Sequence, residues 1–160
     1  MSLIDLTQLV HVLSAFWFVT GLVGRDVVLG RARDADDVER VASLVATAGP
    51  FERLMVIPGS FAVLLFGILT WWAEHLPLWG QDNRWVTVSL VLFATTIPLV
   101  PLVFLPRGKV FEGALSSAVA ERRMTPELRA ALRDPAVASA RVYEKVVVAL
   151  VIALMVTKPF

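Results

Sequence analysis

Cysteine is absent from the 160-residue sequence, which excludes disulfides, thiolate metal sites, iron–sulfur clusters and a cysteine nucleophile. Histidine occurs only twice, so imidazole chemistry is restricted to His11 and His75. The net charge of +1 gives no basic surplus of the kind that nucleic-acid-binding domains carry. We therefore expect no nucleic-acid partner.

Catalytic signatures are missing as well. The sequence contains no Ser-His-Asp arrangement, no glycine loop of the kind that cradles phosphates and no zinc-ligand spacing, and it leaves open whether the protein is an enzyme. No basic segment precedes the first apolar run, and no small-residue cleavage pattern follows it. We expect that run to be a retained span rather than a signal peptide.

Apolar residues, in contrast, are abundant. They make up 57% of the chain, above the roughly 45–50% of a soluble domain, and the mean hydropathy is +0.71. A bilayer core about 30 Å thick requires about 20 apolar residues per helix. The sequence predicts an all-α integral membrane four-helix bundle with helical cytoplasmic extensions, forming a single membrane domain over residues 1–160. The predicted spans lie near residues 4–33, 51–74, 84–105 and 135–158.

Basic residues predict the orientation in the bilayer. Of the fifteen lysines and arginines, only Arg84 and Lys158 lie outside the two connections that join the first span to the second and the third to the fourth, or the ends of those spans. The positive-inside rule places both connections in the cytoplasm and both termini outside. The short outer connection is bracketed by Trp71, Trp72, Trp79 and Trp85, as is usual for interfacial tryptophans. These features predict a multi-pass protein of the bacterial cytoplasmic (inner) membrane.

Both cytoplasmic connections are predicted to be helical. Apolar residues between 38 and 48 recur at helical spacing after an aspartate-rich start, and Gly49-Pro50 predicts the end of that helix. In the second connection Thr125 is expected to cap a short helix that opens on Pro126. Asp134-Pro135 is expected to begin the last helix in the same way.

The first predicted helix has two different faces. At 100° per residue, its polar and small residues gather on one side and its bulky apolar residues on the other, so we expect the polar side to face the bundle. The bundle side carries Thr7, His11, Ser14, Ala15, Phe18, Leu22 and Arg25, and the opposite side carries Leu9, Leu13, Phe16 and Val23.

Three prolines are predicted to break the second and third spans: Pro58, Pro98 and Pro101. Each removes a backbone donor and leaves the carbonyl four residues earlier without its helical partner. Thr95 and Thr96 are placed to help satisfy that backbone. The favoured interpretation is a set of kinks tolerated for packing; a hinge or a cavity-lining break is the alternative.

Four charged residues are expected to lie inside the inner edge of the bilayer core: Glu52, Arg53, Arg141 and Glu144. Ionised groups at that depth should pair or reach water. We predict an ion-pair collar in which Glu144 pairs with Arg53, Arg107 or Arg141 and Glu52 finds a similar basic partner. A functional ion or proton path is the alternative.

The residues just described carry a resemblance. The early histidine followed by "AFWFVTG", then "ERLMVIPGSF" and a terminal "MVTKPF", is similar to a bacterial family known only as predicted integral membrane proteins of unknown function. The first helix is also distantly similar to copper-resistance D membrane proteins and to four-helix protoporphyrinogen oxidases that bind haem. The resemblance implies a four-helix membrane protein without implying a reaction. Its markers here are His11, Trp17, Gly21, Glu52, Arg53, Pro58, Gly59, Gly67, Lys158 and Pro159.

Three functional hypotheses follow. The first is a non-enzymatic membrane bundle that contacts the lipid bilayer and acts through a membrane protein partner or as a homo-oligomer. The second is a haem-binding redox protein with His11 as axial ligand, because neutral imidazole is a common haem ligand. The third is metal or ion transport, for which the candidate ligands near the outer surface are His11, His75, Glu74, Met155 and Asp82.

His11 also has a purely structural interpretation. A histidine inside a span can hydrogen-bond a neighbouring helix, with Ser14 or Thr7 completing a polar seam, and such bonds contribute only about 0.6 kcal/mol on average. An ionisable residue within a span is nevertheless a functional candidate by default.

Overall fold

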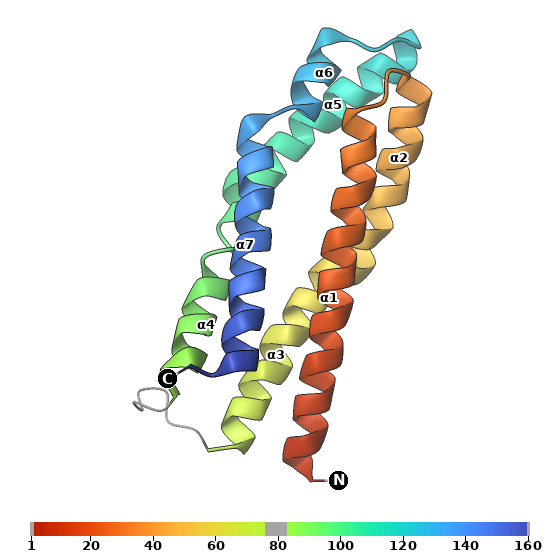
Figure 1. The fold of residues 1–160 in the computed structure, drawn as a ribbon. Coiled ribbons are helices and arrows are strands. Elements are labelled where there is room, and N and C mark those ends of the chain that lie inside the picture. Colours follow the sequence, from red (N-terminus) through yellow and green to blue (C-terminus); the bar gives the residue numbers. More distant parts are fainter. Residues whose placement is uncertain (1, 76–82, 160) are drawn as a thin grey trace. The chain divides into compact units, whose positions relative to one another are not determined.

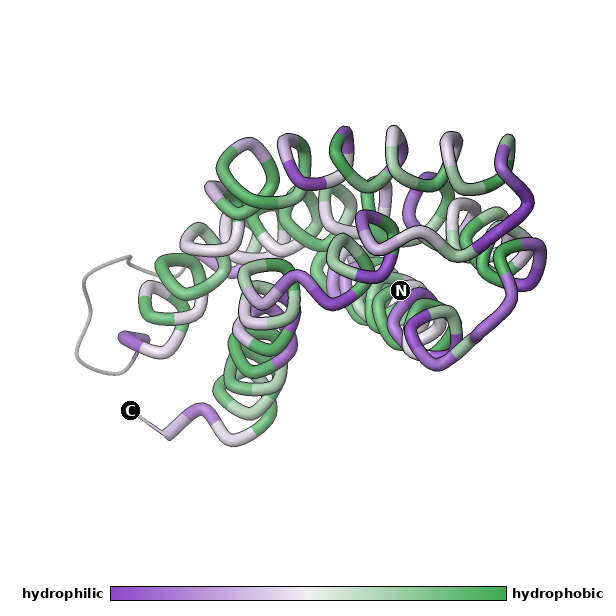
Figure 2. Tube along the Cα trace, turned by 90° about the horizontal axis from the view of Figure 1, so that it is seen from above, coloured by the Kyte–Doolittle hydropathy of each residue, from purple (hydrophilic) through white to green (hydrophobic). Residues whose placement is uncertain are grey.

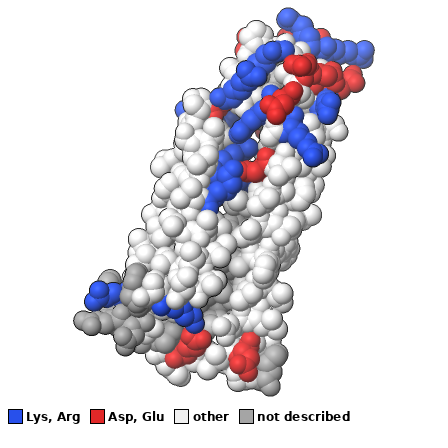
Figure 3. All heavy atoms as spheres, viewed as in Figure 1, with Lys and Arg blue, Asp and Glu red and all other residues white. Residues whose placement is uncertain are grey.

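The computed structural model describes residues 2–75 and 83–159, and these residues are helical or connect helices (Figure 1). The chain divides into two compact units, Met1–His75 and Leu76–Phe160. Among the described residues, two helical stretches are long and apolar enough to span a membrane, Leu3–Arg33 and Val38–Ala73. Apolar residues run along the helices, whereas hydrophilic residues gather at turns and helix ends (Figure 2). Charged side chains likewise gather toward the helix ends (Figure 3).

Helix α1 (Leu3–Arg33) begins with a capping box: the Asp5 amide donates to Ser2 Oγ over 3.1 Å, and the Ser2 amide donates to Asp5 Oδ2 over 2.8 Å. Its buried residues are Thr7, Ser14, Phe18, Gly21, Leu22, Arg25 and Ala32, whereas Leu9, Leu13, Phe16 and Val23 are exposed. The two faces expected for this helix are therefore confirmed.

Helix α2 (Val38–Pro50) ends at Pro50, as predicted, but the chain stays helical beyond it. The chain passes directly into a π-helix, η1 (Phe51–Val56), and then into α3 (Ile57–Ala73). Gly49 has no Cβ to collide with the proline ring, which removes part of the usual conflict before a proline. In the wider π turn a backbone hydrogen bond joins residues five apart: the Ile57 amide donates to the Glu52 carbonyl.

Helix α1 packs antiparallel against η1 and α3, at close range through glycine. A Cβ atom added to Gly21 would lie 2.4 Å from Met55 Cβ on η1, and one added to Gly59 on α3 would lie 3.0 Å from Phe18 Cα. Real Cβ atoms essentially never show the first distance, and the second is tighter than nine in ten real Cβ contacts, so a side chain at either position would force a neighbour to move. Moving along α3 from Gly59 to Gly67, the contact on α1 moves back from Phe18 to His11. Glycine therefore sets the spacing of this helix pair.

In the second unit, α4 (Arg84–Ala94) packs against α7 (Pro135–Thr157), and α5 (Leu105–Glu121) packs against α6 (Pro126–Leu132). Thr125 accepts the Leu128 amide and Asp134 accepts the amides of Ala136 and Val137, as predicted for both caps. The third predicted span, 84–105, is not one regular helix. α4 ends at Ala94, turns follow, and a short π-helix, η3 (Val100–Phe104), leads into α5.

Candidate functional site

His11 lies on the face of α1 that packs against α3, and its ring is half-buried. Its Nδ1 atom is 2.9 Å from the carbonyl oxygen of Val63 on α3. A carbonyl oxygen only accepts, so Nδ1 carries the hydrogen and donates it. In the neutral ring this leaves the lone pair on Nε2, for which the described residues provide no hydrogen-bond partner.

Gly67 provides the space in which the imidazole lies. A Cβ atom at Gly67 would be 2.9 Å from His11 Cε1 and 3.2 Å from Nδ1, so the ring rests where a side chain would otherwise be. Val63 stands one helical turn before Gly67, and the same stretch of α3 therefore supplies both the hydrogen-bond acceptor and the space. His11 is fixed in position and in tautomer by α3.

The expected polar seam around His11 is present only in part. Thr7 and Ser14 are buried on the same face of α1, but each hydroxyl donates to its own helix. Ser14 Oγ donates to the Val10 carbonyl over 2.7 Å, and Thr7 Oγ1 donates to the Ile4 carbonyl over 3.1 Å. Neither hydroxyl donates to His11, because each donates to a backbone carbonyl of its own helix.

Two buried polar atoms were not anticipated from the sequence. Trp71 Nε1, one turn after Gly67 on α3, has no hydrogen-bond partner among the described residues, and neither has Ser89 Oγ on α4. Ser89 is only 1% exposed. The sequence placed Trp71 at the membrane interface and gave no sign that its indole nitrogen would be covered.

The predicted inner charged cluster contains an ion pair of which only Glu52 was assigned to the cluster from the sequence. Arg25 on α1 donates from Nη1 to Glu52 Oε2 over 2.7 Å and from Nε to Asp26 Oδ1 over 3.3 Å. Its side chain is 7% exposed, whereas that of Glu52 is 40% exposed. A basic partner for Glu52 is therefore found, and it is Arg25.

The remaining members of the predicted collar are divided between the two units. Arg53 is exposed on η1 in the first unit, and Arg141 and Glu144 lie on α7 in the second. Arg107 donates instead to Asp134, the residue that caps α7. This hydrogen bond from Arg107 is the main reason that the pKa of Asp134 is lowered. A collar that joins these groups, and the pairing of Glu144, stay predictions.

The three helix-breaking prolines lie at changes of helix type. Pro58 stands at the start of α3, directly after η1, and Pro101 stands in the first turn of η3. Around Pro98 the carbonyls of Ala94 and Ile97 accept the amides of Ile97 and Val100 over 3.2 Å each. Thr95 and Thr96 donate to the carbonyls of Leu92 and Phe93. Backbone hydrogen bonds between residues three apart thus replace the bonds between residues four apart that proline removes.

The other proposed ligands do not gather around His11 in the first unit. His75 is exposed just after α3, with a left-handed φ of 53°. No group of three or more His, Asp or Glu residues that could hold a metal ion occurs in residues 2–75 and 83–159. Asp82 lies outside the described residues.

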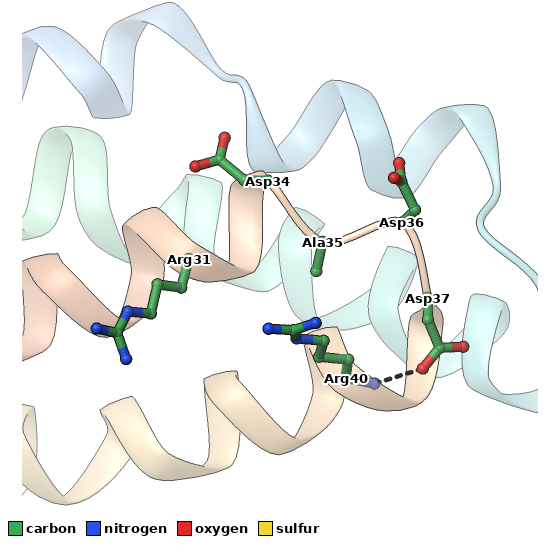
Figure 4. A pocket seen from close by; sticks show the side chains of 6 residues that line it. All are labelled: Arg31, Asp34, Ala35, Asp36, Asp37 and Arg40. Atoms are coloured by element: carbon green, nitrogen blue, oxygen red, sulfur yellow. Dashed lines mark hydrogen bonds between the residues drawn. The ribbon is translucent and has the colours of Figure 1, made fainter.

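A pocket of about 460 Å³ lies at the connection between α1 and α2. Figure 4 shows the guanidinium groups of Arg31 and Arg40 turned into the space between the two helices. The carboxylates of Asp34, Asp36 and Asp37 point to other sides, and Asp37 accepts the Arg40 amide over 2.9 Å. The sequence suggested only a capped helix start here.

Comparison with known families identifies the chain. A family described as "Predicted integral membrane protein (DUF2269)" matches residues 5–159. The chain belongs to this family. No protein with a curated description and no solved structure matches it. The resemblance to predicted integral membrane proteins is thereby confirmed and the chain is a membrane protein, whereas the more distant likeness to copper-resistance D proteins and protoporphyrinogen oxidases is not shown.

Proposed function

We propose that this DUF2269 protein is a multi-pass protein of the bacterial cytoplasmic membrane that binds haem through His11. Four spans and outward termini are the arrangement that the distribution of basic residues supports. The large apolar side chains that α1 and α3 leave exposed, such as Phe16 at 69% and Phe61 at 70%, suit contact with lipid acyl chains.

The hydrogen bond from His11 Nδ1 to the Val63 carbonyl is the observation that carries the haem proposal. Metal-ligating histidines nearly always donate their second ring N–H to a carbonyl or carboxylate, which fixes the ring and raises the basicity of the ligating nitrogen. His11 has this arrangement, and its Nε2 keeps a lone pair. His11 alone would suffice to hold haem iron, because the porphyrin itself supplies four nitrogen ligands.

The surroundings of His11 also fit a haem ligand. The imidazole is held against Gly67 without a side chain to displace it. One turn further along α3, the buried Trp71 Nε1–H is a donor without a partner among the described residues, and it offers a hydrogen bond to a polar group of a ligand. Bound haem would supply one-electron redox chemistry, which this sequence provides by no other group that we identify.

We expect the purified protein, produced with added haem precursor, to show a Soret absorbance band that His11→Ala abolishes. The reason is that removing the imidazole removes the only ligand that the proposal assigns to the iron. His75→Ala is the matched control, because it removes the second histidine of the chain and should leave the band unchanged.

Other spectra would contradict the proposal in different ways. A band of unchanged position and intensity in His11→Ala would remove His11 from the role of ligand. A native protein without any band, yet folded by circular dichroism, would refute haem binding. Loss of the band in His75→Ala alone would move the ligand to the other histidine.

A second candidate function is a non-enzymatic bundle that acts through a partner or as a homo-oligomer. Helix α5, which follows the third predicted span, leaves Val110 66% exposed and Val119 45% exposed, and such side chains suit a protein contact outside the bilayer. A colourless protein that runs as a dimer in detergent, and as a monomer after Val110→Glu, would favour this candidate over haem binding.

A further inference from the structure

The pocket between the ends of α1 and α2 has no role in haem binding, and its lining has a distinct chemistry. We propose that it binds a phosphate group through Arg31 and Arg40. The source in the cell is either the headgroup of an anionic phospholipid or free phosphate, and the experiment below distinguishes the two.

The two arginines are available for a ligand. Both guanidinium groups turn into the space between α1 and α2 (Figure 4), and the described residues provide no ion-pair partner for either. Guanidinium is planar and presents paired donors that match phosphate oxygens in a bidentate manner. Two such groups that line one pocket form a site for a tetrahedral anion rather than for a cation.

The three aspartates of the connection do not convert the pocket into a cation site. Asp34, Asp36 and Asp37 point away from the side to which the guanidinium groups turn. Asp37 is already an acceptor for the Arg40 amide at the start of α2. The two arginines and three aspartates give the lining a formal charge of −1, so anion binding depends on the local position of the guanidinium groups, and removing one aspartate should strengthen it.

The place of the pocket on the helix suits a lipid phosphate. Arg31 lies in the last turn of α1, six residues after Arg25, the first basic residue that follows the long apolar stretch of the helix. In a spanning helix the phosphate layer begins where the hydrocarbon-facing residues end, and Lys and Arg at that depth bind anionic headgroups. The 13-residue helix α2 places Arg40 in its first turn, where it lines the same pocket as Arg31.

The test measures the melting temperature of the full-length protein in neutral detergent against three additives. These are short-chain phosphatidylglycerol, the matching phosphatidylcholine, and inorganic phosphate. A ligand that binds only the folded protein raises the melting temperature in proportion to its affinity. We expect phosphatidylglycerol to stabilise the native protein at concentrations where phosphatidylcholine does not.

Single charge removals make the test specific. Arg31→Gln and Arg40→Gln should each raise the phosphatidylglycerol concentration needed for half of the stabilisation by about fivefold, the usual effect of one basic side chain at a membrane surface. Arg33→Gln is the matched control, because Arg33 lies in the same last turn of α1 but does not line the pocket. Asp34→Asn should lower the required concentration.

Each outcome decides the proposal. Equal stabilisation by inorganic phosphate and phosphatidylglycerol would identify free phosphate as the ligand, and stabilisation by phosphatidylglycerol alone would identify the lipid. A native protein that responds to neither additive would overturn the proposal. An effect of Arg33→Gln as large as that of Arg31→Gln would also overturn it, because charge at the helix end and not the pocket would then be responsible.

Discussion

Gly21→Ala should lower the unfolding free energy by about 1–3 kcal/mol, the usual range for overpacking a close contact. The added Cβ would lie 2.4 Å from Met55 Cβ, 3.2 Å from the Val56 amide nitrogen and 3.3 Å from the Met55 carbonyl carbon. None of these atoms is the far end of a flexible side chain, so α1 and η1 must separate. Thermal unfolding in detergent, followed by circular dichroism, measures the loss.

Gly30→Ala provides the matched control on the same helix. A Cβ atom there meets nothing within 4 Å, and the backbone is helical without positive φ. Alanine should therefore stabilise the helix by about 0.5–1 kcal/mol through its better helix propensity. The two glycine substitutions should thus act with opposite signs. If Gly21→Ala proved as stable as Gly30→Ala, the close approach of α1 and η1 would be wrong.

Glu52→Gln should also destabilise the protein, by about 1–3 kcal/mol, because it leaves Arg25 buried beside a neutral partner. Removing one member of a fully buried pair costs about 3–5 kcal/mol. The expected loss is smaller here, since the Glu52 side chain is 40% exposed and Asp26 stays 3.3 Å from the arginine. Chemical unfolding of the variant in detergent gives the change.

The pair Glu121–Arg123 offers a control of similar geometry but different exposure. Its nitrogen and oxygen are 2.6 Å apart, close to the 2.7 Å between Arg25 and Glu52, yet the side chain of Arg123 is 68% exposed and that of Glu121 is 45% exposed. Glu121→Gln should cost well under about 1 kcal/mol. Equal losses in Glu52→Gln and Glu121→Gln would show that burial of Arg25 adds nothing to the pair.

Much of the fold follows from the sequence because local rules determine it. The extent of α1 and the two caps at Thr125 and Asp134 were predicted from apolar periodicity and capping residues. The π-helix that follows Gly49-Pro50 and the turns after Ala94 were not predicted, because proline there indicated only a helix end or a kink. At these places the chain adopts π turns or hydrogen bonds between residues three apart. Which of these forms depends on the packing of neighbouring turns, and neither has a distinct sequence signature.

For each contact of the candidate site, the sequence placed the residue on α1 but did not identify its partner on the neighbouring helix. Periodicity placed His11 and Arg25 on the packed face of α1, and both lie there. It could not identify Val63 and Gly67 as the partners of His11, because the register between two helices depends on three-dimensional packing. The spacing of Gly59 and Gly67 was the available signal, and glycine alone does not tell which residue it faces.

The ring tautomer of His11 tests most directly whether Nδ1 donates to Val63 and leaves Nε2 available as a ligand. We propose nitrogen-15 NMR of the haem-free protein labelled at histidine, at about pH 8, where an ordinary histidine is neutral. The variant His75→Gln leaves a single histidine, so the signals need no further assignment. We expect a protonated Nδ1 and an unprotonated Nε2, because the Val63 carbonyl accepts from Nδ1. A proton on Nε2 and none on Nδ1 would contradict both the hydrogen bond and the availability of Nε2 as a ligand.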